Sequence, residues 1–504
     1  MGEPPLVRRV AGGLRRRAAW LWSRLVVGER PPTAEIAFAV LTGGLSDEGS
    51  EVPVDCPSLL GAAIETLRPL GADDIARRWG QWLVSRQGPD GSLPERGRRI
   101  PSPVATAWAA RGWWALRTEM PELDTPLQAA CHYLHAWLGT KARSGRLDTL
   151  DQLAPTERIA LAACLPLLRQ AAALGTREPW ETSVRSVVQN ARQLDVRHVG
   201  NPATDEQAWS ARLAWADALR DLGASDAAAR MLDAAESTSS RANSAQLALL
   251  AACLYRLGRR ESADRLMHRL RRRIAPGGRA RSAGLRGQRS RLTSLWTAKH
   301  YLDAAVLQVR AAFEAEPEGV PEAIDPTDGR VEAVRQWLRG LPEDCRIAEP
   351  GCGRGRYLRH VSRWMPSAQL VGIDIAPAML RALPAGVEGL EGSLLRIPTP
   401  DGAFDAAFAV ESLEHALLPS QAVAELCRVV RPGGRVLIID KDRACQALSH
   451  HQPWERWYTP AELQGWLARH CTDVRVAGVS HLEGRPGNRL FLTAQGIRRS
   501  HPTV

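Results

Sequence analysis

The stretch Cys345-Arg-Ile-Ala-Glu-Pro-Gly-Cys-Gly-Arg-Gly-Arg-Tyr357 decides the fold of the C-terminal third of this 504-residue chain. A short apolar run at 346–348 predicts a buried strand, and the acid Glu349 ends it. Glycines at alternate positions then lead into a helical pattern. Such glycines let the backbone turn sharply and approach a ligand, and the following helix offers free N–H groups at its start. The stretch therefore predicts a nucleotide-binding turn. The alternative, a dinucleotide-binding dehydrogenase, normally spaces its glycines G-x-G-x-x-G.

Further strand-like segments follow this turn. Leu370-Val-Gly-Ile-Asp374 is apolar and ends in a carboxylate, which is placed to accept hydrogen bonds from ribose hydroxyls. The later segments are a third unit at 391–405, a strand at 406–410 that runs into Glu411-Ser-Leu-Glu-His415, a helix at 422–430 and a strand at 435–440. Strands that alternate with helices predict a parallel sheet, which binds its ligands at the carboxyl ends of the strands.

In this order the segments resemble the class I S-adenosylmethionine-dependent methyltransferases of the small-molecule, methyltransferase domain 11 kind, over roughly residues 330–495. The resemblance implies a Rossmann-like α/β fold whose glycine turn holds the methionine part of the cofactor. It also implies that Asp374 holds the ribose and that Ser393 and Leu394 lie beside the adenine. Residues 411–415 would then form the floor of the methyl-transfer site. The implied cofactor residues are Glu349, Gly351, Cys352, Gly353, Gly355, Asp374, Ile375, Ser393, Leu394 and Glu411. Pro350, and Ser393 in place of a frequent Asp, depart from the family pattern.

The expected reaction is displacement at a sulfonium methyl group, for which the enzyme mainly aligns the nucleophile and excludes water. His415 is the candidate general base, because its unperturbed pKa lies near neutrality and it follows the fourth strand. The alternative is that it braces the following helix. The candidates for contact with the acceptor are His451, Trp454 and Trp457, whose alternative role is to pack the final helix. No metal is expected, since two adjacent histidines without a third ligand make a poor site.

Residues 31–312 predict an almost wholly helical domain, with apolar residues at helical spacing. The segment at 102–114 has a late counterpart at 290–302, in which Trp108 matches Trp296, and this self-similarity favours a ring of helices. Trp82-Leu-Val-Ser-Arg-Gln-Gly-Pro-Asp-Gly-Ser-Leu-Pro94 also resembles the repeat of terpenoid cyclase and prenyltransferase-like α/α toroids. The acidic D-x-D-D motif of the cyclases is missing, so no cyclase activity is assigned. A tetratricopeptide-like solenoid is the competing prediction.

The formal charge of +11 is concentrated in two arginine-rich windows, at 1–30 and 269–291. The first window predicts an N-terminal arm that packs on the domain through its tryptophans. Contact with an anionic membrane surface is the second interpretation of this arm. Nucleic-acid binding ranks last, because no aromatic residues interleave with the basic ones. The 9 cysteines form no C-x-x-C pair, which fits reduced cytoplasmic thiols, and no apolar run reaches membrane-spanning length.

The sequence thus predicts a basic arm at 1–30, an all-α toroid-like domain at 31–312, an acidic linker at 313–329 and a methyltransferase domain at 330–498. The expected activity is O- or N-methylation of a small-molecule or glycan- or lipid-linked acceptor, with the helical domain assisting acceptor or partner binding. A non-catalytic scaffold that binds the cofactor is the main alternative. A cyclase–methyltransferase fusion is the second.

Overall fold

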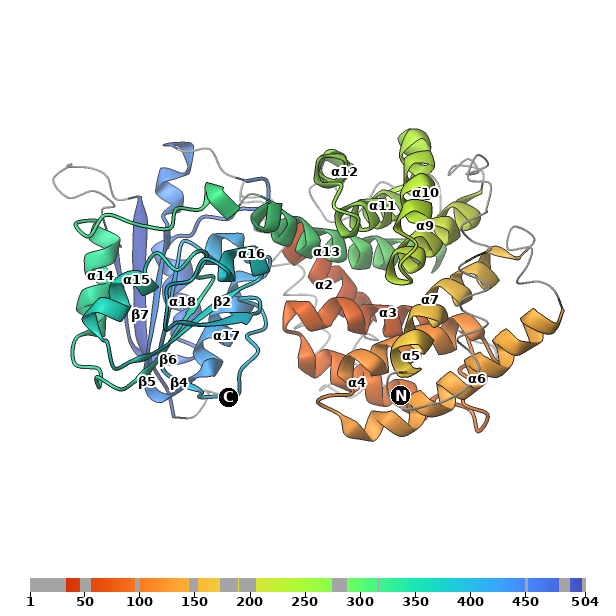
Figure 1. Ribbon diagram of the computed structural model, residues 1–504, viewed down its shortest axis with the longest axis horizontal. Helices are drawn as coiled ribbons and strands as arrows, with labels where there is room; N and C mark the ends of the chain where they lie inside the picture. The colour runs from red at the N-terminus through yellow and green to blue at the C-terminus, as the bar shows by residue number, and fades with distance from the viewer. Residues whose placement is uncertain are drawn as a thin grey trace, which may run out of the picture. The chain divides into compact units, whose positions relative to one another are not determined.

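The chain forms two compact units in the computed structural model (Figure 1). The first comprises Met1–Arg68 and Ala72–Gln308, and the second comprises Pro69–Gly71 and Val309–Val504. The residues that the structure describes are 33–45, 56–95, 100–144, 153–172, 189, 205–273, 288–315, 317–448, 452–479 and 490–500. The predicted basic arm, most of the second basic window and His451 lie outside these residues.

All regular structure described in the first unit is helical, as predicted, apart from one isolated β-bridge between Pro94 and Pro101. The α-helices are α2 (Thr33–Leu45), α3 (Pro57–Leu67), α4 (Asp73–Ser85), α5 (Pro103–Leu116), α6 (Asp124–Arg143), α7 (Pro155–Ala172), α9 (Glu206–Asp221), α10 (Ser225–Thr238), α11 (Ser244–Arg256), α12 (Arg260–Arg273) and α13 (Gln288–Ala315). Nowhere in the described ranges is a helix both long and apolar enough to cross a membrane.

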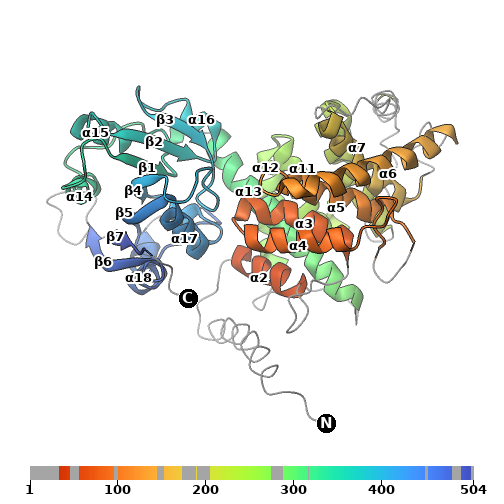
Figure 2. The ribbon, with the colours of Figure 1, turned by 90° about the horizontal axis from the view of Figure 1, so that it is seen from below.

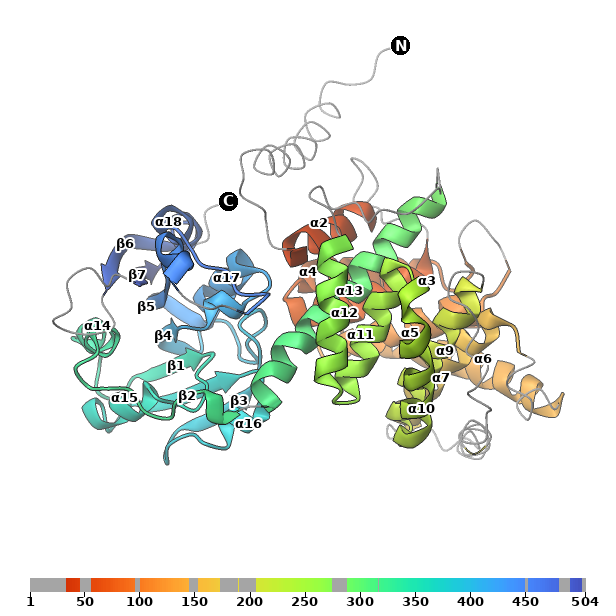
Figure 3. The same cartoon turned by 90° about the horizontal axis from the view of Figure 1, so that it is seen from above.

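The helices of the first unit pack in a regular order. Helix α3 contacts α5, α5 contacts α7, α7 contacts α9 and α9 contacts α11. Their successors α4, α6, α10 and α12 lie against α3, α5, α9 and α11 in turn (Figures 2 and 3). The contact between α3 and α5 depends on Gly61, because a Cβ there would lie 2.2 Å from the Trp108 carbonyl oxygen.

In the second unit, seven described strands form one sheet in the order β3-β2-β1-β4-β5-β7-β6. They are β1 (Arg346–Pro350), β2 (Gln369–Asp374), β3 (Glu388–Glu391), β4 (Phe404–Val410), β5 (Val430–Lys441), β6 (Cys471–Val479) and β7 (Phe491–Arg498). The pairings among β1 to β5 are all parallel, whereas β7 runs antiparallel to β5 and β6. The strand order reverses between β1 and β4, so the carboxyl ends of these two strands border the crevice where such sheets bind ligands.

The helices of this unit are α14 (Gly329–Leu338), α15 (Leu358–Trp364), α16 (Pro377–Leu380), α17 (Pro419–Val429) and α18 (Pro460–Leu467). The predicted parallel strands are confirmed. One difference is that the predicted turn at 431–434 lies within β5, which begins at Val430 rather than Arg435. The unit begins at Val309, so the C-terminal residues of α13 belong to it.

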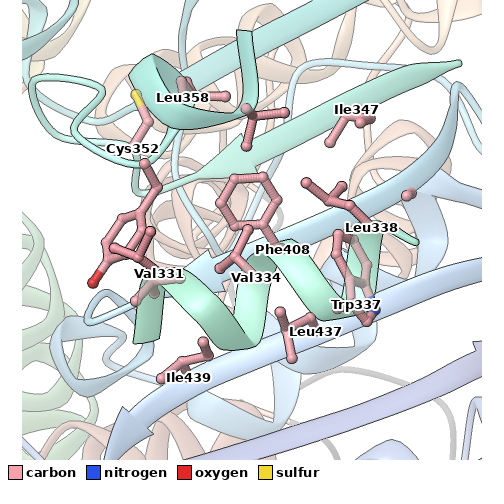
Figure 4. Close-up of a cluster of buried hydrophobic side chains, with 14 of the residues drawn as sticks. Val331, Val334, Trp337, Leu338, Ile347, Cys352, Leu358, Phe408, Leu437 and Ile439 are labelled. Atoms are coloured by element: carbon pink, nitrogen blue, oxygen red, sulfur yellow. The ribbon is translucent and has the colours of Figure 1, made fainter. Parts of the chain in front are cut away.

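The core of the second unit lies where α14 packs on the sheet (Figure 4). Val334 and Trp337 of α14 are buried together with Phe408 of β4 and Leu437 of β5. The Trp337 and Phe408 rings meet edge to face with centroids 6.0 Å apart. Because Phe408 lies on the strand that leads to the candidate site, this packing positions the chemistry as well as the fold.

Phe408→Ala should lower the free energy of unfolding of the second unit by about 3–5 kcal/mol, since it removes a fully buried ring and leaves a cavity. Hydrogen exchange in urea, followed in peptides from β4 and β5, would measure the change. Ile497→Ala is the control, because Ile497 is 38% exposed and its loss should cost much less. Equal effects of the two substitutions would contradict this placement of the core.

Candidate active site in the second unit

The predicted glycine turn is held tightly between its neighbours. Gly351 donates its N–H to the Ile373 carbonyl oxygen over 2.7 Å. It has φ +74°, and a Cβ on it would lie 2.3 Å from Cβ of Ser412, at the end of β4. Gly355 has φ +75°, and a Cβ there would meet the Leu383 side chain at 2.8 Å. Only glycine tolerates this combination of backbone angle and close approach.

Asp374, at the end of β2, organises the turn. Its carboxylate accepts the N–H of Gly353 at 2.9 Å and that of Ala376 at 3.0 Å, one on each oxygen. Burial raises the pKa of Asp374, and the backbone N–H donors oppose the shift. Each carboxylate oxygen has a second acceptor site, so the group keeps the capacity to bind ribose hydroxyls. Ile375, the other residue predicted here, follows it and is half-buried.

Glu349 supplies a buried acceptor at the same edge of the sheet. It is 1% exposed, and its Oε2 atom has no hydrogen-bond partner among the described residues. Burial raises the pKa of Glu349 well above its usual value, while Arg356 opposes the shift. An unpaired buried oxygen is costly, so this position fits a ligand that brings its own N–H or O–H donors.

Cys352 faces the core and not the crevice. Its side chain belongs to the buried cluster of Figure 4, and burial raises the pKa of its thiol. The structure therefore gives no support for a nucleophilic thiol, and a role in cofactor binding would fall to the backbone.

The predicted adenine residues follow β3. Ser393 accepts the Leu395 N–H on its hydroxyl oxygen at 3.1 Å, which fixes the turn. Leu394 comes within 3.6 Å of the point where Gly351 would carry a Cβ. The loop after β3 thus lies beside the glycine turn, and the Ser393 hydroxyl can still act as a donor.

Two arginines that the sequence did not single out lie at the same edge. Arg330 of α14 and Arg356 both donate to the Glu411 carboxylate, and the Tyr357 hydroxyl lies 3.3 Å from it. Arg330 is also held by Asp328 through bonds of 2.9 and 2.8 Å. Glu411 has φ +50°, an uncommon angle for a residue with a side chain and one that clusters at functional sites.

A second group of charges surrounds His415. Its Nε2 atom lies 3.3 Å from Oε1 of Glu414, and its Nδ1 atom lies 4.0 Å from Oε1 of Glu455. The ammonium of Lys441 lies 2.9 Å from Glu414 and 3.7 Å from Glu455. Among the described residues, His415 Nδ1 has no hydrogen-bond partner. We call these four residues the His415 cluster.

The surrounding chain holds this cluster in place. The Tyr458 hydroxyl donates to the Leu413 carbonyl oxygen at 2.6 Å, and the Arg456 N–H donates to that of Glu414 at 2.9 Å. Phe313 packs edge to face on the His415 ring at 4.9 Å. Of the three residues predicted to contact the acceptor, the structure describes Trp454 and Trp457. Trp457 is buried beside Lys441, whose ammonium lies 5.3 Å from the centroid of the ring, and Trp454 is half-buried.

The charges of the cluster oppose the effect of burial. Burial alone would raise the pKa of Glu414, but His415 and Lys441 outweigh it and lower this pKa to about 2. Burial and the nearby Glu414 raise the pKa of Asp440, which accepts the Glu414 N–H at 3.1 Å. Ligand atoms of Glu414, His415 and Glu455 lie within 4.8 Å of one another, close enough to share a cation. Lys441 already provides positive charge there.

Glu414→Gln should make the free energy of unfolding depend less on pH in the acidic range. The lowered pKa means that ionised Glu414 stabilises the fold above its ordinary pKa of 4.5, and that this contribution disappears as the pH falls toward about 2. The variant should be less stable than the wild type by about 1–3 kcal/mol at pH 7 and equally stable near pH 2. Urea unfolding at several pH values would measure this difference. Glu343→Gln, on the surface, is the control, and a constant difference at all pH values would contradict the assignment.

Gly351→Ala should weaken binding of S-adenosylmethionine, the cofactor that the sequence implies, at least tenfold, because the new Cβ would displace the turn from Ser412. Gly386→Ala is a matched control: Gly386 has φ +84°, but nothing lies within 4 Å of its Cβ position. Calorimetric titration of both variants separates the close approach from backbone strain. Similar losses in the two variants would argue against a closely packed binding turn.

Comparison with known proteins agrees with this geometry. A family model described as a methyltransferase domain matches residues 348–438. Demethylmenaquinone methyltransferase of Thermus thermophilus is 35% identical over 118 residues, which are 22% of this chain and 53% of the relative. Malonyl-[acyl-carrier protein] O-methyltransferase of Methylococcus capsulatus is 26% identical over 180 residues, 34% of this chain and 63% of the relative. The chain thus spans about half to two-thirds of the length of these relatives.

Other matches are of the same kind. Ubiquinone biosynthesis O-methyltransferase of Xanthomonas oryzae is 28% identical over 207 residues, which cover 36% of this chain and 82% of the relative. A putative methyltransferase solved in complex with the Haloferax volcanii Trm112 activator superposes with a TM-score of 0.32 at 17% identity and covers 39% of this chain and 100% of its own. The matched segment holds the glycine turn, Asp374, Glu414 and His415, and it ends within β5, before Lys441 and Glu455. The second unit of this chain therefore contains a class I S-adenosylmethionine-dependent methyltransferase domain, with S-adenosylmethionine as its cofactor.

Proposed function

We propose that this protein transfers a methyl group to an oxygen or nitrogen atom of a small-molecule or glycan- or lipid-linked acceptor. The observation that carries the proposal is that Nδ1 of His415, at the carboxyl edge of the sheet that also holds the glycine turn, has no hydrogen-bond partner among the described residues. A general base needs a free lone pair, and the opposite nitrogen of His415 is already engaged by Glu414.

The residues at the carboxyl ends of β1 and β2 fit the cofactor. Bound there, S-adenosylmethionine supplies a methyl group on a positively charged sulfur. The alternate glycines would cradle its methionine part, and the Asp374 carboxylate would accept hydrogen bonds from the ribose. We assign Arg330 and Arg356 to the cofactor carboxylate, because both guanidinium groups meet at Glu411 and arginine suits planar oxyanions.

The acceptor side relies on the His415 cluster. With Nε2–H directed at Glu414, Nδ1 is the atom that would take a proton from an acceptor hydroxyl or ammonium. Glu414 stays ionised, because its pKa is about 2, and it would stabilise the imidazolium that forms. The positive charge of Lys441 offsets the negative charges of Glu414 and Glu455, and Phe313 limits the motion of the His415 ring.

We also infer that the helical unit is an α/α toroid. The repeat residues Trp108 and Trp296, far apart in sequence, meet with ring centroids 6.4 Å apart. Thr66 of α3 donates to Asp303 of α13 at 2.7 Å, so the helix that starts the packing series also contacts α13, the last helix of the first unit in chain order. Gln87, the glutamine of the repeat phrase, donates to the Gly91 and Pro126 carbonyl oxygens at 2.9 and 2.8 Å. A closed ring accounts for these contacts more simply than an open solenoid does.

Two variants separate an enzyme from a scaffold. Asp374→Ala should weaken S-adenosylmethionine binding at least tenfold in calorimetry, equivalent to about 1.4 kcal/mol. His415→Gln should leave that affinity unchanged and lower methyl transfer at least a hundredfold, as expected for loss of a general base.

Transfer would be measured with labelled cofactor against panels of phenols, amines and glycans, and circular dichroism would show that both variants fold. If the wild type binds the cofactor but transfers no methyl group to any member of the panels, the result favours the interpretation as a non-catalytic scaffold. If His415→Gln transfers at the wild-type rate, the base assignment is wrong.

A further inference from the structure

The first unit contains a group of charges that the methyltransferase chemistry does not use. It consists of three acids and three cations from α3, α5, α9, α11 and α13, and we call it the inner charge cluster. Its members are Glu65, Arg111, Asp217, Arg256, Lys299 and Asp303. Each acid pairs with one of these cations, at 2.9 Å for Glu65 and Arg111, 2.6 Å for Asp217 and Arg256, and 2.8 Å for Asp303 and Lys299. Asp217 also lies 3.5 Å from Arg220, which pairs with Asp221 at 2.6 Å.

The three cations lie close to one another. The Arg111 guanidinium and the Lys299 ammonium both approach the ring of Trp108, at 4.9 and 5.5 Å from its centroid. Burial alone would raise the pKa of Asp303, but Lys299 and Arg256 together lower it, so Arg256 acts on the same carboxylate as Lys299. Nearby acids outweigh the effect of burial and raise the pKa of Arg111 and Arg256, so both guanidinium groups stay charged.

The ion pairs with the acids do not use all the N–H donors of the two guanidinium groups. Glu65 takes only Nε of Arg111, and Asp217 takes only one terminal nitrogen of Arg256. Within the described ranges, the terminal nitrogens of Arg111 make no hydrogen bond to the protein. Solvent still reaches these side chains, since Arg111 is 23% exposed and Arg256 27% exposed. A guanidinium with two free parallel N–H groups matches a carboxylate.

An aromatic surface adjoins these donors. Trp108 meets Trp296 edge to face, and Trp296 stacks on His300 with centroids 5.3 Å apart. Burial and the charge of Lys299 lower the pKa of His300 to about 3, so its ring is neutral at pH 7. Its Nδ1 atom has no hydrogen-bond partner in the described part of the chain. Trp108 and Trp296 are both half-buried, so part of each side chain stays exposed beside these donors.

We propose that the first unit binds an organic carboxylate with an aromatic body, its carboxylate at Arg111 and Arg256 and its ring against Trp108 and Trp296. The three acids already balance the three cations, so a single negative charge is better accommodated than the double charge of a phosphate ester. Nothing in this site depends on the methyltransferase function proposed above.

Titration calorimetry of the full chain with 2-naphthoate tests the proposal. Naphthoate should bind saturably, and 2-naphthalenemethanol, which lacks the charge, should bind at least tenfold more weakly. Arg111→Gln should also weaken naphthoate binding at least tenfold. Arg77→Gln is the matched control, because Arg77 of α4 makes ion pairs on the surface. Asp374→Ala should leave naphthoate binding unchanged.

Circular dichroism would confirm that Arg111→Gln folds. Arg111→Lys keeps the charge but loses the two parallel N–H groups, so it should weaken naphthoate binding in a folded protein. Absence of saturable naphthoate binding would overturn the proposal. Equal binding of the alcohol, or equal losses in the Arg111 and Arg77 variants, would also overturn it. Tighter binding of 2-naphthyl phosphate than of naphthoate would overturn the assignment to a carboxylate.

Discussion

The active-site edge depends on the close approach of two backbones, where Gly351 follows β1 and Ser412 follows β4. These strands are parallel neighbours, with Ile347 opposite Ala406, so their carboxyl ends reach the same point of the sheet. A side chain at Gly351 would meet Ser412 at 2.3 Å, and the Ser412 hydroxyl donates to the Pro350 carbonyl oxygen at 3.3 Å. This contact sets the distance between the cofactor turn and the segment that carries Glu411 and His415. The left-handed backbone of Glu411 is the strained link between them.

Much of this arrangement could be predicted from the sequence, because its signals are local. Alternate glycines after a short apolar run predicted the turn at 351–355, and the acid that ends the next run predicted the position of Asp374. Both predictions use only strand length, glycine conformation and the rule that parallel strands end at one edge. Pro-Gly-Gly at 432–434 also marks an irregularity: one pair joins Phe404 and Val430, and after a register shift regular pairing with β4 runs from Arg435, the predicted start of the strand.

The ionic contacts could not be predicted in the same way. Arg330 meets Glu411 and Lys441 meets Glu414 across long stretches of chain, and no periodicity links such positions. The same holds for Thr66 and Asp303 in the helical unit. Arginine and lysine are common on surfaces, so their presence in the sequence does not tell a partnered buried cation from a solvated one. Only the packing of α14 on the sheet, and of α13 against α3, brings these groups together.

Buried charge is costly, and well-packed apolar side chains in its place are often no less stable. The His415 cluster and the inner charge cluster both carry this cost. Within the described ranges, Nδ1 of His415 in the first cluster and Nδ1 of the adjoining His300 in the second have no hydrogen-bond partner. A purely structural ion network gains most when every donor and acceptor is satisfied. Incomplete pairing around charges that are otherwise balanced is what a binding site requires, because the last hydrogen bonds are left for the ligand. This argument supports both proposals, a methyl-transfer site in the second unit and an anion site in the first.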